Sequence, residues 1–285
     1  MRRINFIPVL VVSACISTGP AFSEKRYLSS GAHWEFVEKN ICEKPDKLLK
    51  QRIKIERKQY GKSAQRRPLW AYIIHPRPDT EASLVKNIYL IAAQHGDELN
   101  TTRVLEYFLQ DLQPLSRSWL NHRRIIIIPL YNPDGYKKHN RLAHDNIDLN
   151  RDFATSDAPE GNPKAPETHA FLKLLELYPA NRIYNFHQPF RVVLHGPDDE
   201  ELAKPFAIMS DYPLGQGVGY PTPGSLGIYG REHKISVITV ELSRSMRKLM
   251  APFIYEEVRL AIFHAAFGCI PKTALKSTLE KRVSD

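Results

Sequence analysis

Residues 87–98 read NIYLIAAQHGDE, an apolar run that leads directly into His95 and Glu98. An apolar run of this length predicts a buried strand, and the residues that follow it predict a helix. An imidazole and a carboxylate three residues apart at such a junction lie on one face and can bind the same metal ion. Because a hydrolytic zinc ion needs three protein ligands and one open position for water, the segment calls for a third ligand and a base elsewhere.

An H-x-x-E pair alone is a weak signal in a chain with 11 histidines, since it also occurs at ordinary helix starts. Four further motifs give it weight. They are NPDG at residues 132–135, RLAHDNIDLNRD at 141–152, NFHQP at 185–189 and VITVEL at 237–242. The first alone indicates a turn after a strand. The last places Glu241 inside a buried strand, where a carboxylate is rare without a partner or a task.

In this order the five motifs resemble those of the zinc carboxypeptidase family, and the resemblance extends from about residue 60 to the helix after Glu241. Two further stretches, VGYPTPGSLG at residues 218–227 and PET at 166–168, look like the branch of the family that acts on murein peptides. The resemblance implies one zinc ion per chain. It also implies hydrolysis of the bond between γ-D-glutamate and meso-diaminopimelate in murein peptides.

The resemblance implies a role for each matched residue near the metal. His95, Glu98 and His187 match the zinc ligands. Asp148 matches the carboxylate that hydrogen-bonds the first histidine ligand, a contact that fixes the imidazole tautomer. Glu241 matches the general base, which deprotonates the attacking water and later protonates the leaving amine.

The resemblance also implies residues that hold the substrate. Arg141 matches the cation that stabilises the oxyanion of the tetrahedral intermediate. Asn150 and Arg151 match the pair that binds the free carboxylate of the leaving residue, a task that suits a guanidinium fork. Tyr220 matches a mobile tyrosine that closes over substrate. Asp152 departs from the family pattern, and we expect it to sense a positive charge on the leaving residue, directly or by orienting Arg151.

Each assignment has a simpler structural alternative. Arg141 can be a surface base, Arg151 can form a structural salt bridge, Asp148 can cap a helix and Tyr220 can be an ordinary loop aromatic. Asp152 can form a structural hydrogen bond to the loop around Arg141. The other nine histidines match no ligand position and are interpreted as surface or core residues, although a substrate contact stays open for the one at position 144.

Two other functions are compatible with the same motifs. One is a zinc carboxypeptidase that releases ordinary C-terminal L-amino acids. The other is a non-catalytic module on the same fold that binds cell-wall peptides. Zinc content and the activity lost to a chelator distinguish a catalyst from such a module.

Residues 1–23 have the pattern of an export signal. Arg2 and Arg3 supply the charged region, residues 4–16 the apolar region and residues 21–23 a small-x-small cleavage site. The apolar run is too short to span a membrane. The pattern predicts an exported protein, located in the periplasm or cell envelope.

A second interpretation of the same segment uses VSAC at residues 12–15, which resembles a lipoprotein box and would leave a lipid anchor at Cys15. The apolar region before this cysteine is short, which favours ordinary cleavage. Both interpretations place the mature protein outside the cytoplasm.

The remaining chain is predicted to form an N-terminal extension at 24–50, a catalytic domain at 51–270 and a polar tail at 271–285. Strands are expected at residues 51–60, 69–75, 87–93, 123–131, 182–186, 191–195 and 236–242, and helices at 98–113, 166–178, 200–210 and 247–267. This alternation predicts an α/β fold with an open, mixed, largely parallel sheet covered by helices on both faces. Ligands at the carboxyl ends of strands fit such a sheet.

The formal net charge of +9 falls to +7 if Arg2 and Arg3 leave with the signal. The basic stretch at residues 47–58 comes with no nucleic-acid recognition motif, so nucleic acid is not expected as a partner. A cationic surface suits anionic cell-wall fragments. Without the signal the chain keeps Cys42 and Cys269, which can form a disulfide or remain two buried thiols.

Overall fold

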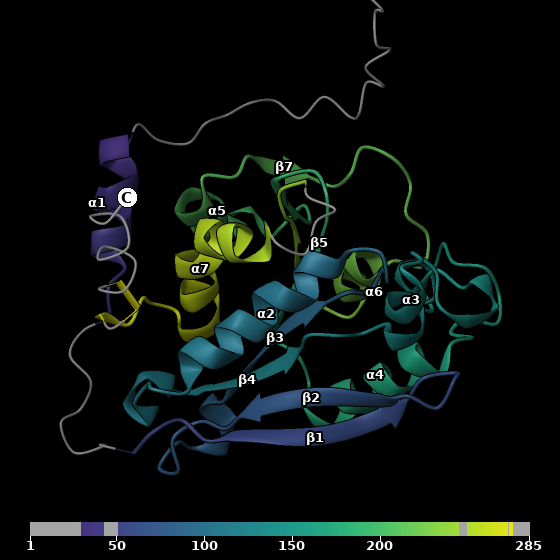
Figure 1. Cartoon of the computed structure of the whole chain (residues 1–285), viewed down its shortest axis with the longest axis horizontal. Coiled ribbons are helices and arrows are strands. Elements are labelled where there is room, and N and C mark those ends of the chain that lie inside the picture. Colours follow the sequence, from purple (N-terminus) through teal and green to yellow (C-terminus); the bar gives the residue numbers. More distant parts are fainter. Residues whose placement is uncertain (1–29, 43–50, 245–249, 273, 276–285) are drawn as a thin grey trace, which may run out of the picture.

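The computed structural model describes residues 30–42, 51–244, 250–272 and 274–275 (Figure 1). The predicted signal peptide, its cleavage site and the alternative lipid anchor at Cys15 lie outside the described residues, as does most of the predicted polar tail. None of the helices in the described ranges is both long enough and apolar enough to cross a membrane.

Eight strands form a single sheet in the order β1-β2-β4-β3-β5-β8-β6-β7. Their bounds are β1 Ile55–Lys62, β2 Pro68–Ile74, β3 Lys86–Ala92, β4 Arg123–Ile128, β5 Arg182–His187, β6 Val192–His195, β7 Leu214–Gln216 and β8 Ser236–Glu241. Strands β4, β3, β5 and β8 are parallel neighbours, and β6 pairs in parallel with β7. The β1–β2, β2–β4 and β6–β8 pairs are antiparallel. The predicted mixed, largely parallel sheet is confirmed.

The central parallel strands are almost continuously apolar because helices cover both of their faces (Figure 1). One core cluster lies between the sheet and α2, α5 and α7, and α1 packs against α5 at its outer side. A second cluster lies between the sheet and α4 and α6. The helices are α1 Ser30–Lys39, α2 Leu99–Leu112, α3 Pro133–Lys138, α4 Pro166–Leu177, α5 Glu200–Ser210, α6 Leu226–Glu232 and α7 Ala251–Phe267. Short 3-10 helices span Ala82–Leu84, Arg117–Leu120, His144–Asn146 and Leu149–Arg151.

The seven predicted strands and four predicted helices all exist, with bounds shifted by one to four residues at several ends. The first strand begins at Ile55 rather than at residue 51, and part of the predicted start of α7 falls in residues 245–249, outside the described part of the chain. Helices α1, α3 and α6 and strand β7 were not predicted. These elements are short, so their apolar residues repeat too few times to give a period.

Cys42 and Cys269 form a disulfide, which decides between the two alternatives that the sequence left open. Ile41 and Ile270 pair beside it in an isolated parallel bridge. The predicted N-terminal extension is therefore fastened to the end of α7. Cross-links that join distant parts of a chain stabilise a fold mainly by restricting the unfolded state.

His264 on α7 is expected to make the folded protein sensitive to acid. Burial lowers the pKa of His264 to about 4, and the nearby guanidinium groups of Arg123 and Arg182 act in the same direction. In the unfolded chain a histidine titrates near its ordinary pKa of about 6.5. Between these values the unfolded state binds more protons, so stability falls as the pH falls through this window.

We expect this effect to reach about 1–2 kcal/mol at pH 5. The measurement compares the Tm of the metal-free protein at pH 7 and pH 5 with that of His264→Leu. The variant should lose less stability on acidification than the parent. An equal loss in both proteins would assign the acid sensitivity to other groups.

Candidate metal centre

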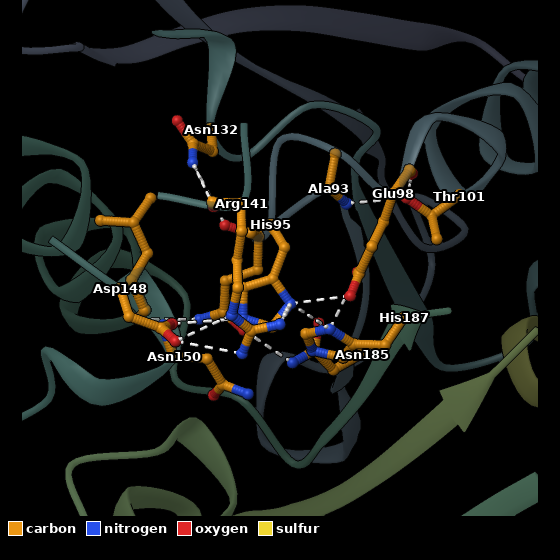
Figure 2. Close-up of polar contacts among 12 residues, drawn as sticks. Ala93, His95, Glu98, Thr101, Asn132, Arg141, Asp148, Asn150, Asn185 and His187 are labelled. Atoms are coloured by element: carbon orange, nitrogen blue, oxygen red, sulfur yellow. Dashed lines mark hydrogen bonds and ion pairs between the residues drawn. The ribbon is translucent and has the colours of Figure 1, made fainter. Parts of the chain in front are cut away.

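The junction between β3 and α2 is shaped by a short hydrogen-bonded loop. Ala93 has φ of +52°, which turns the chain sharply at the end of β3. Its amide donates to Oγ1 of Thr101 at 3.0 Å, and that hydroxyl donates to the carbonyl oxygen of Glu98 at 2.7 Å (Figure 2). The loop thereby directs the side chains of His95 and Glu98 to the same side.

The carboxyl ends of β3 and β5 meet at one edge of the sheet and bring three potential ligands together. Nδ1 of His95 lies 2.8 Å from Oε1 of Glu98, and Nδ1 of His187 lies 3.0 Å from Oε2 of the same carboxylate. The two Nδ1 atoms are 3.1 Å apart. All three side chains are buried, and within the described ranges this is the one group of His, Cys, Asp or Glu residues arranged to hold a metal ion.

The second ring nitrogen of His95 is held by a carboxylate. Nε2 of His95 lies 3.2 Å from Oδ1 of Asp148, whose Oδ2 accepts from Nη2 of Arg141 at 3.0 Å (Figure 2). Nδ1 of His95 also faces a carboxylate, that of Glu98, so both ring nitrogens can carry protons when no metal is bound. A metal ion at Nδ1 would leave the proton on Nε2, where Asp148 accepts it. Nε2 of His187 has no hydrogen-bond partner among the described residues.

The site also shifts the pKa values of its acids and bases. Burial lowers the pKa of His95, but Glu98 and Asp148 outweigh burial and raise it to about 9. Burial raises the pKa of Glu98, yet the two histidines bring it down to about 2. These opposite shifts arise because a buried carboxylate sits between two buried imidazoles, an arrangement that stabilises positive charge at the centre of the cluster.

Glu241 lies beside this cluster at the end of β8. It is the register partner of His187 on the neighbouring parallel strand, and it is 6% exposed. Burial raises the pKa of Glu241 to about 7, with Glu98 adding to the effect and His187 opposing it. Its Oε2 atom has no hydrogen-bond partner in the described part of the chain. A buried carboxyl with a pKa near neutrality and a free oxygen is suited to accept and return a proton.

A cavity of about 790 Å³ opens in front of the cluster. It runs along one face of β8, because Val237, Thr239 and Glu241 line it and alternate residues of a strand face the same side. Val237 therefore lies roughly 13 Å from Glu241 along the strand. The cavity therefore has room for a long side chain of a molecule bound at the metal cluster.

The predicted substrate-holding residues Arg141, Asn150, Arg151 and Tyr220 all line this cavity. Oδ1 of Asn150 accepts a hydrogen bond from the backbone amide of Leu226 at 3.0 Å. This bond orients the side-chain amide, and its NH₂ group can donate to a substrate. The Arg151 side chain donates to the carbonyl oxygen of Asn150 at 2.6 Å. Tyr220 is 53% exposed.

The structure corrects the prediction that Asp152 contacts the substrate. Asp152 is 2% exposed and does not line the cavity. Its two carboxylate oxygens accept from the backbone amides of Lys164 at 2.8 Å and Ala165 at 3.0 Å, at the start of α4. The side chain thus joins two backbone segments, and its partners are not in the Arg141 loop that the structural alternative named.

The NPDG motif begins a helix and supports residues 93–98, the ligand loop that carries His95 and Glu98. Asn132 caps α3 by accepting from the amide of Gly135 at 2.8 Å, with Pro133 in the first turn. A Cβ atom at Gly96 would overlap the backbone of Gly135, so the ligand loop and the α3 start are in direct backbone contact. Asp134 is buried and accepts from the Ser63 hydroxyl at 2.8 Å. The motif that resembled a simple turn therefore braces the loop that carries the first two potential ligands.

Sequence reasoning missed the end of the cavity that lies away from the metal cluster. Acidic and basic side chains line this end: Asp198 and Asp199 lie between β6 and α5, and Arg231 and Lys234 lie around the end of α6. Because β6 runs antiparallel to β8, the residues after β6 and those before β8 lie at the end of β8 opposite Glu241. His195, interpreted from sequence as a surface or core residue, also lines the cavity, whereas His144 does not. Isolated charged residues in loops and at helix ends carry no pattern in sequence, and only the packing of α5 against β6 and of α6 against β8 reveals that they line one cavity.

Comparison with known proteins identifies the family. Residues 46–205 match the profile described as zinc carboxypeptidase, more than half of the chain. The chain belongs to the zinc carboxypeptidase family. It is a zinc metallopeptidase by this membership, and the buried His-Glu-His group is the part of the described structure that can hold the ion.

The chain is similar both to a murein peptide amidase and to a carboxypeptidase. The chain is 28% identical to murein peptide amidase A of Escherichia coli strain K12 in an alignment of 204 residues that covers 64% of this chain and 79% of the relative. It is 30% identical to carboxypeptidase D of Rattus norvegicus over 156 residues, 50% of this chain and 11% of that protein.

Solved structures confirm the zinc carboxypeptidase fold. The murein-tripeptide amidase of Escherichia coli O157 superposes with a TM-score of 0.61 at 23% identity, covering 76% of this chain and 95% of the other. Carboxypeptidase A of Helicoverpa armigera gives 0.64 at 17% identity, covering 83% and 71%. At these identities the likeness concerns the fold alone.

The donor set fits the zinc of this family. Two imidazoles and one carboxylate form a set typical of catalytic zinc sites. Bonds of about 2.1 Å in a tetrahedral arrangement put ligand atoms ~3.4 Å apart, so the separations of 2.8–3.1 Å need to widen by only a few tenths of an ångström. When bound, zinc would polarise the scissile carbonyl as a Lewis acid and lower the pKa of a bound water to about 7.

Proposed function

We propose that this zinc metallopeptidase is an amidase that cleaves the bond between γ-D-glutamate and meso-diaminopimelate in murein peptides. The charged end of the cavity carries the proposal. Diaminopimelate has one carboxylate next to the scissile bond and a second ammonium and carboxylate at the far end of its side chain. Arg151 lies near the metal cluster to bind the first, and the acidic and basic groups around Asp199 and Arg231 suit the second pair.

The alignment with the murein peptide amidase covers most of that relative, whereas the alignment with carboxypeptidase D covers 11% of it. The first relative therefore supports the same substrate class. Murein peptide amidase A of Escherichia coli is by its name an amidase of murein peptides, and 79% of its length aligns with this chain. A carboxypeptidase that binds apolar C-terminal residues would leave acidic and basic groups in this pocket without partners, which costs free energy.

In the proposed reaction the metal ligands, Asp148 and Glu241 have separate tasks. His95, Glu98 and His187 hold the metal, and Asp148 keeps the proton of His95 on Nε2. The Glu241 carboxylate takes a proton from the attacking water and gives it to the leaving nitrogen of diaminopimelate.

Further groups position the substrate and the charge that develops on it. The Arg141 guanidinium, held by Asp148, stabilises the negative charge that develops on the carbonyl oxygen. Asn150 and Arg151 hold the carboxylate beside the scissile bond. Tyr220, at the exposed rim of the cavity, covers the bound peptide.

We further propose that the mature protein acts outside the cytoplasm, in the periplasm or cell envelope. The charged and apolar regions of residues 1–23 support export. The disulfide between Cys42 and Cys269 is typical of an oxidising compartment. Murein is located in the same compartment.

The deciding experiment measures kcat/KM of the zinc-loaded protein on L-Ala-γ-D-Glu-meso-diaminopimelate and on the same tripeptide ending in L-Lys. The two substrates differ only in the distal carboxylate. We expect diaminopimelate to be preferred roughly 10-fold or more, the value of one charge-assisted hydrogen bond. Faster cleavage of ordinary peptides ending in L-amino acids would make the protein a general carboxypeptidase. If the zinc-loaded protein turned over none of these substrates, the result would favour the non-catalytic module that binds cell-wall peptides.

Arg151→Ala is expected to raise KM for substrates with a free product-side carboxylate by about 10–100-fold, because a charge-assisted contact is lost. The measurement uses the tripeptide as its free acid and as the amide of the same carboxyl group. Wild-type protein should prefer the acid, and the variant should treat both alike. A variant that keeps the wild-type preference for the acid would exclude Arg151 from carboxylate binding.

A further inference from the structure

Gln94, the residue before His95, is bonded at both ends of its side-chain amide. Its Oε1 atom accepts from Nδ2 of Asn185 at 2.9 Å, and its Nε2 atom donates to the carbonyl oxygen of Leu149 at 3.1 Å. Gln94 is fully buried, and so are both of its partners. The amide therefore exchanges hydrogen bonds only with protein groups that are themselves shielded from water.

Each partner of Gln94 belongs to a different functional segment. Asn185 lies two residues before His187 on β5, so the two side chains leave the strand on the same side, and Figure 2 places them next to each other. Leu149 lies between Asp148, which holds the ring of His95, and Asn150. Together with its own backbone neighbour His95, Gln94 touches all three segments that build the site.

The chemistry of these contacts calls for an amide. Leu149 offers a carbonyl acceptor and Asn185 offers an NH₂ donor, so the side chain between them must supply one donor and one acceptor. A glutamate at position 94 would face the Leu149 carbonyl with a second acceptor. An apolar side chain would leave two buried polar groups unpaired, and each such group costs about 1–3 kcal/mol.

We propose that Gln94 is a positioning residue that fixes the ends of β3 and β5 and the Asp148–Arg151 segment relative to one another. Zinc affinity and binding of the substrate carboxylate then depend on the same buried amide. The part that concerns the carboxylate rests on the proposed function of Arg151. The part that concerns zinc rests only on the three potential ligands and their contacts.

The test replaces Gln94 with Met, which keeps the length of the side chain and removes both hydrogen bonds. We expect the zinc dissociation constant, measured by competition with a chelator, to rise about 10–100-fold, as for other residues that orient metal ligands. KM for the free-acid tripeptide should rise with it, while the amide of that tripeptide should be affected less.

Two control variants separate positioning from general stability. Thr102→Val removes a buried hydroxyl that has no partner among the described residues, and it should leave zinc affinity unchanged. Val258→Ala lowers stability from the buried face of α7, a helix that contains none of the three segments. If Val258→Ala weakens zinc binding as much as Gln94→Met, or if Gln94→Met binds zinc within threefold of wild type, the proposal is overturned.

A double-variant cycle identifies the bond that carries the effect. Asn185→Leu should weaken zinc binding on its own, and adding it to Gln94→Met should cost much less than the two separate losses combined, because both remove the same contact. Fully multiplicative losses would show that the Gln94–Asn185 bond does not transmit the effect. Because zinc affinity is measured without substrate, this result stands apart from the outcome of the murein assay.

Discussion

Replacing His187 with Ala is expected to remove zinc and activity together. The imidazole supplies one of three buried potential ligands, and its Nδ1 atom lies 3.0 Å from Glu98 and 3.1 Å from His95. With two ligands left, zinc affinity should fall by more than the 10–100-fold typical of residues that merely orient ligands. Zinc content after gel filtration and residual hydrolysis are the two measurements.

His195→Ala is the matched control for this loss. His195 lines the same cavity but is outside the ligand group, so its removal should leave zinc content intact. The folded state of both variants is checked by the Tm of the metal-free proteins. Stoichiometric zinc retained by His187→Ala would refute the assignment of this histidine as a ligand.

Replacing Glu241 with Gln is expected to leave zinc bound and to lower kcat by about 10²–10⁴-fold, the contribution typical of a general base. The amide has nearly the same shape as the carboxyl group but cannot accept the proton of water. Glu241 is buried at the end of β8 with a pKa raised to about 7, so its neutral replacement adds no desolvation penalty. Fold and zinc content should therefore be unchanged.

Glu167→Gln tests whether any buried carboxyl has this effect. Glu167 is 1% exposed and its pKa is also raised by burial, but it lies at the start of α4 outside the cavity. This control should keep near-normal kcat. A zinc-loaded Glu241→Gln protein with near-normal turnover would mean that another group is the base.

The sequence by itself determined the central sheet and the identity of the metal cluster. The apolar runs of β3 and β4 are nearly uninterrupted, and inside β5 and β8 only Asn185 and Thr239 separate apolar residues, because strands covered on both faces are largely apolar. The motifs at their carboxyl ends have fixed places in the chain order, and parallel neighbouring strands bring those ends to one edge. His95, Glu98, His187 and Glu241 were named because these motifs resemble those of the zinc carboxypeptidase family, and the strand ends explain why they meet.

Only the tertiary structure decided how the side chains around this cluster are used. Asp152 follows Arg151 in sequence and was expected at the substrate, but its carboxylate faces the amides that begin α4. Neighbours in sequence can point in opposite directions, and a hydrogen bond to a distant backbone amide leaves no trace in the local pattern. Gln94 likewise had no signal, since its partners lie 55 and 91 residues away.

The charged end of the cavity and the disulfide have the same physical origin. Asp199 and Arg231 belong to separate segments, and the packing of α5 against β6 and of α6 against β8 makes them line one cavity. Cys42 and Cys269 are 227 residues apart, so pairing depended on where α1 and the end of α7 lie. Contacts between distant segments are set by the packing of the whole fold, whereas strand patterns are set by local burial.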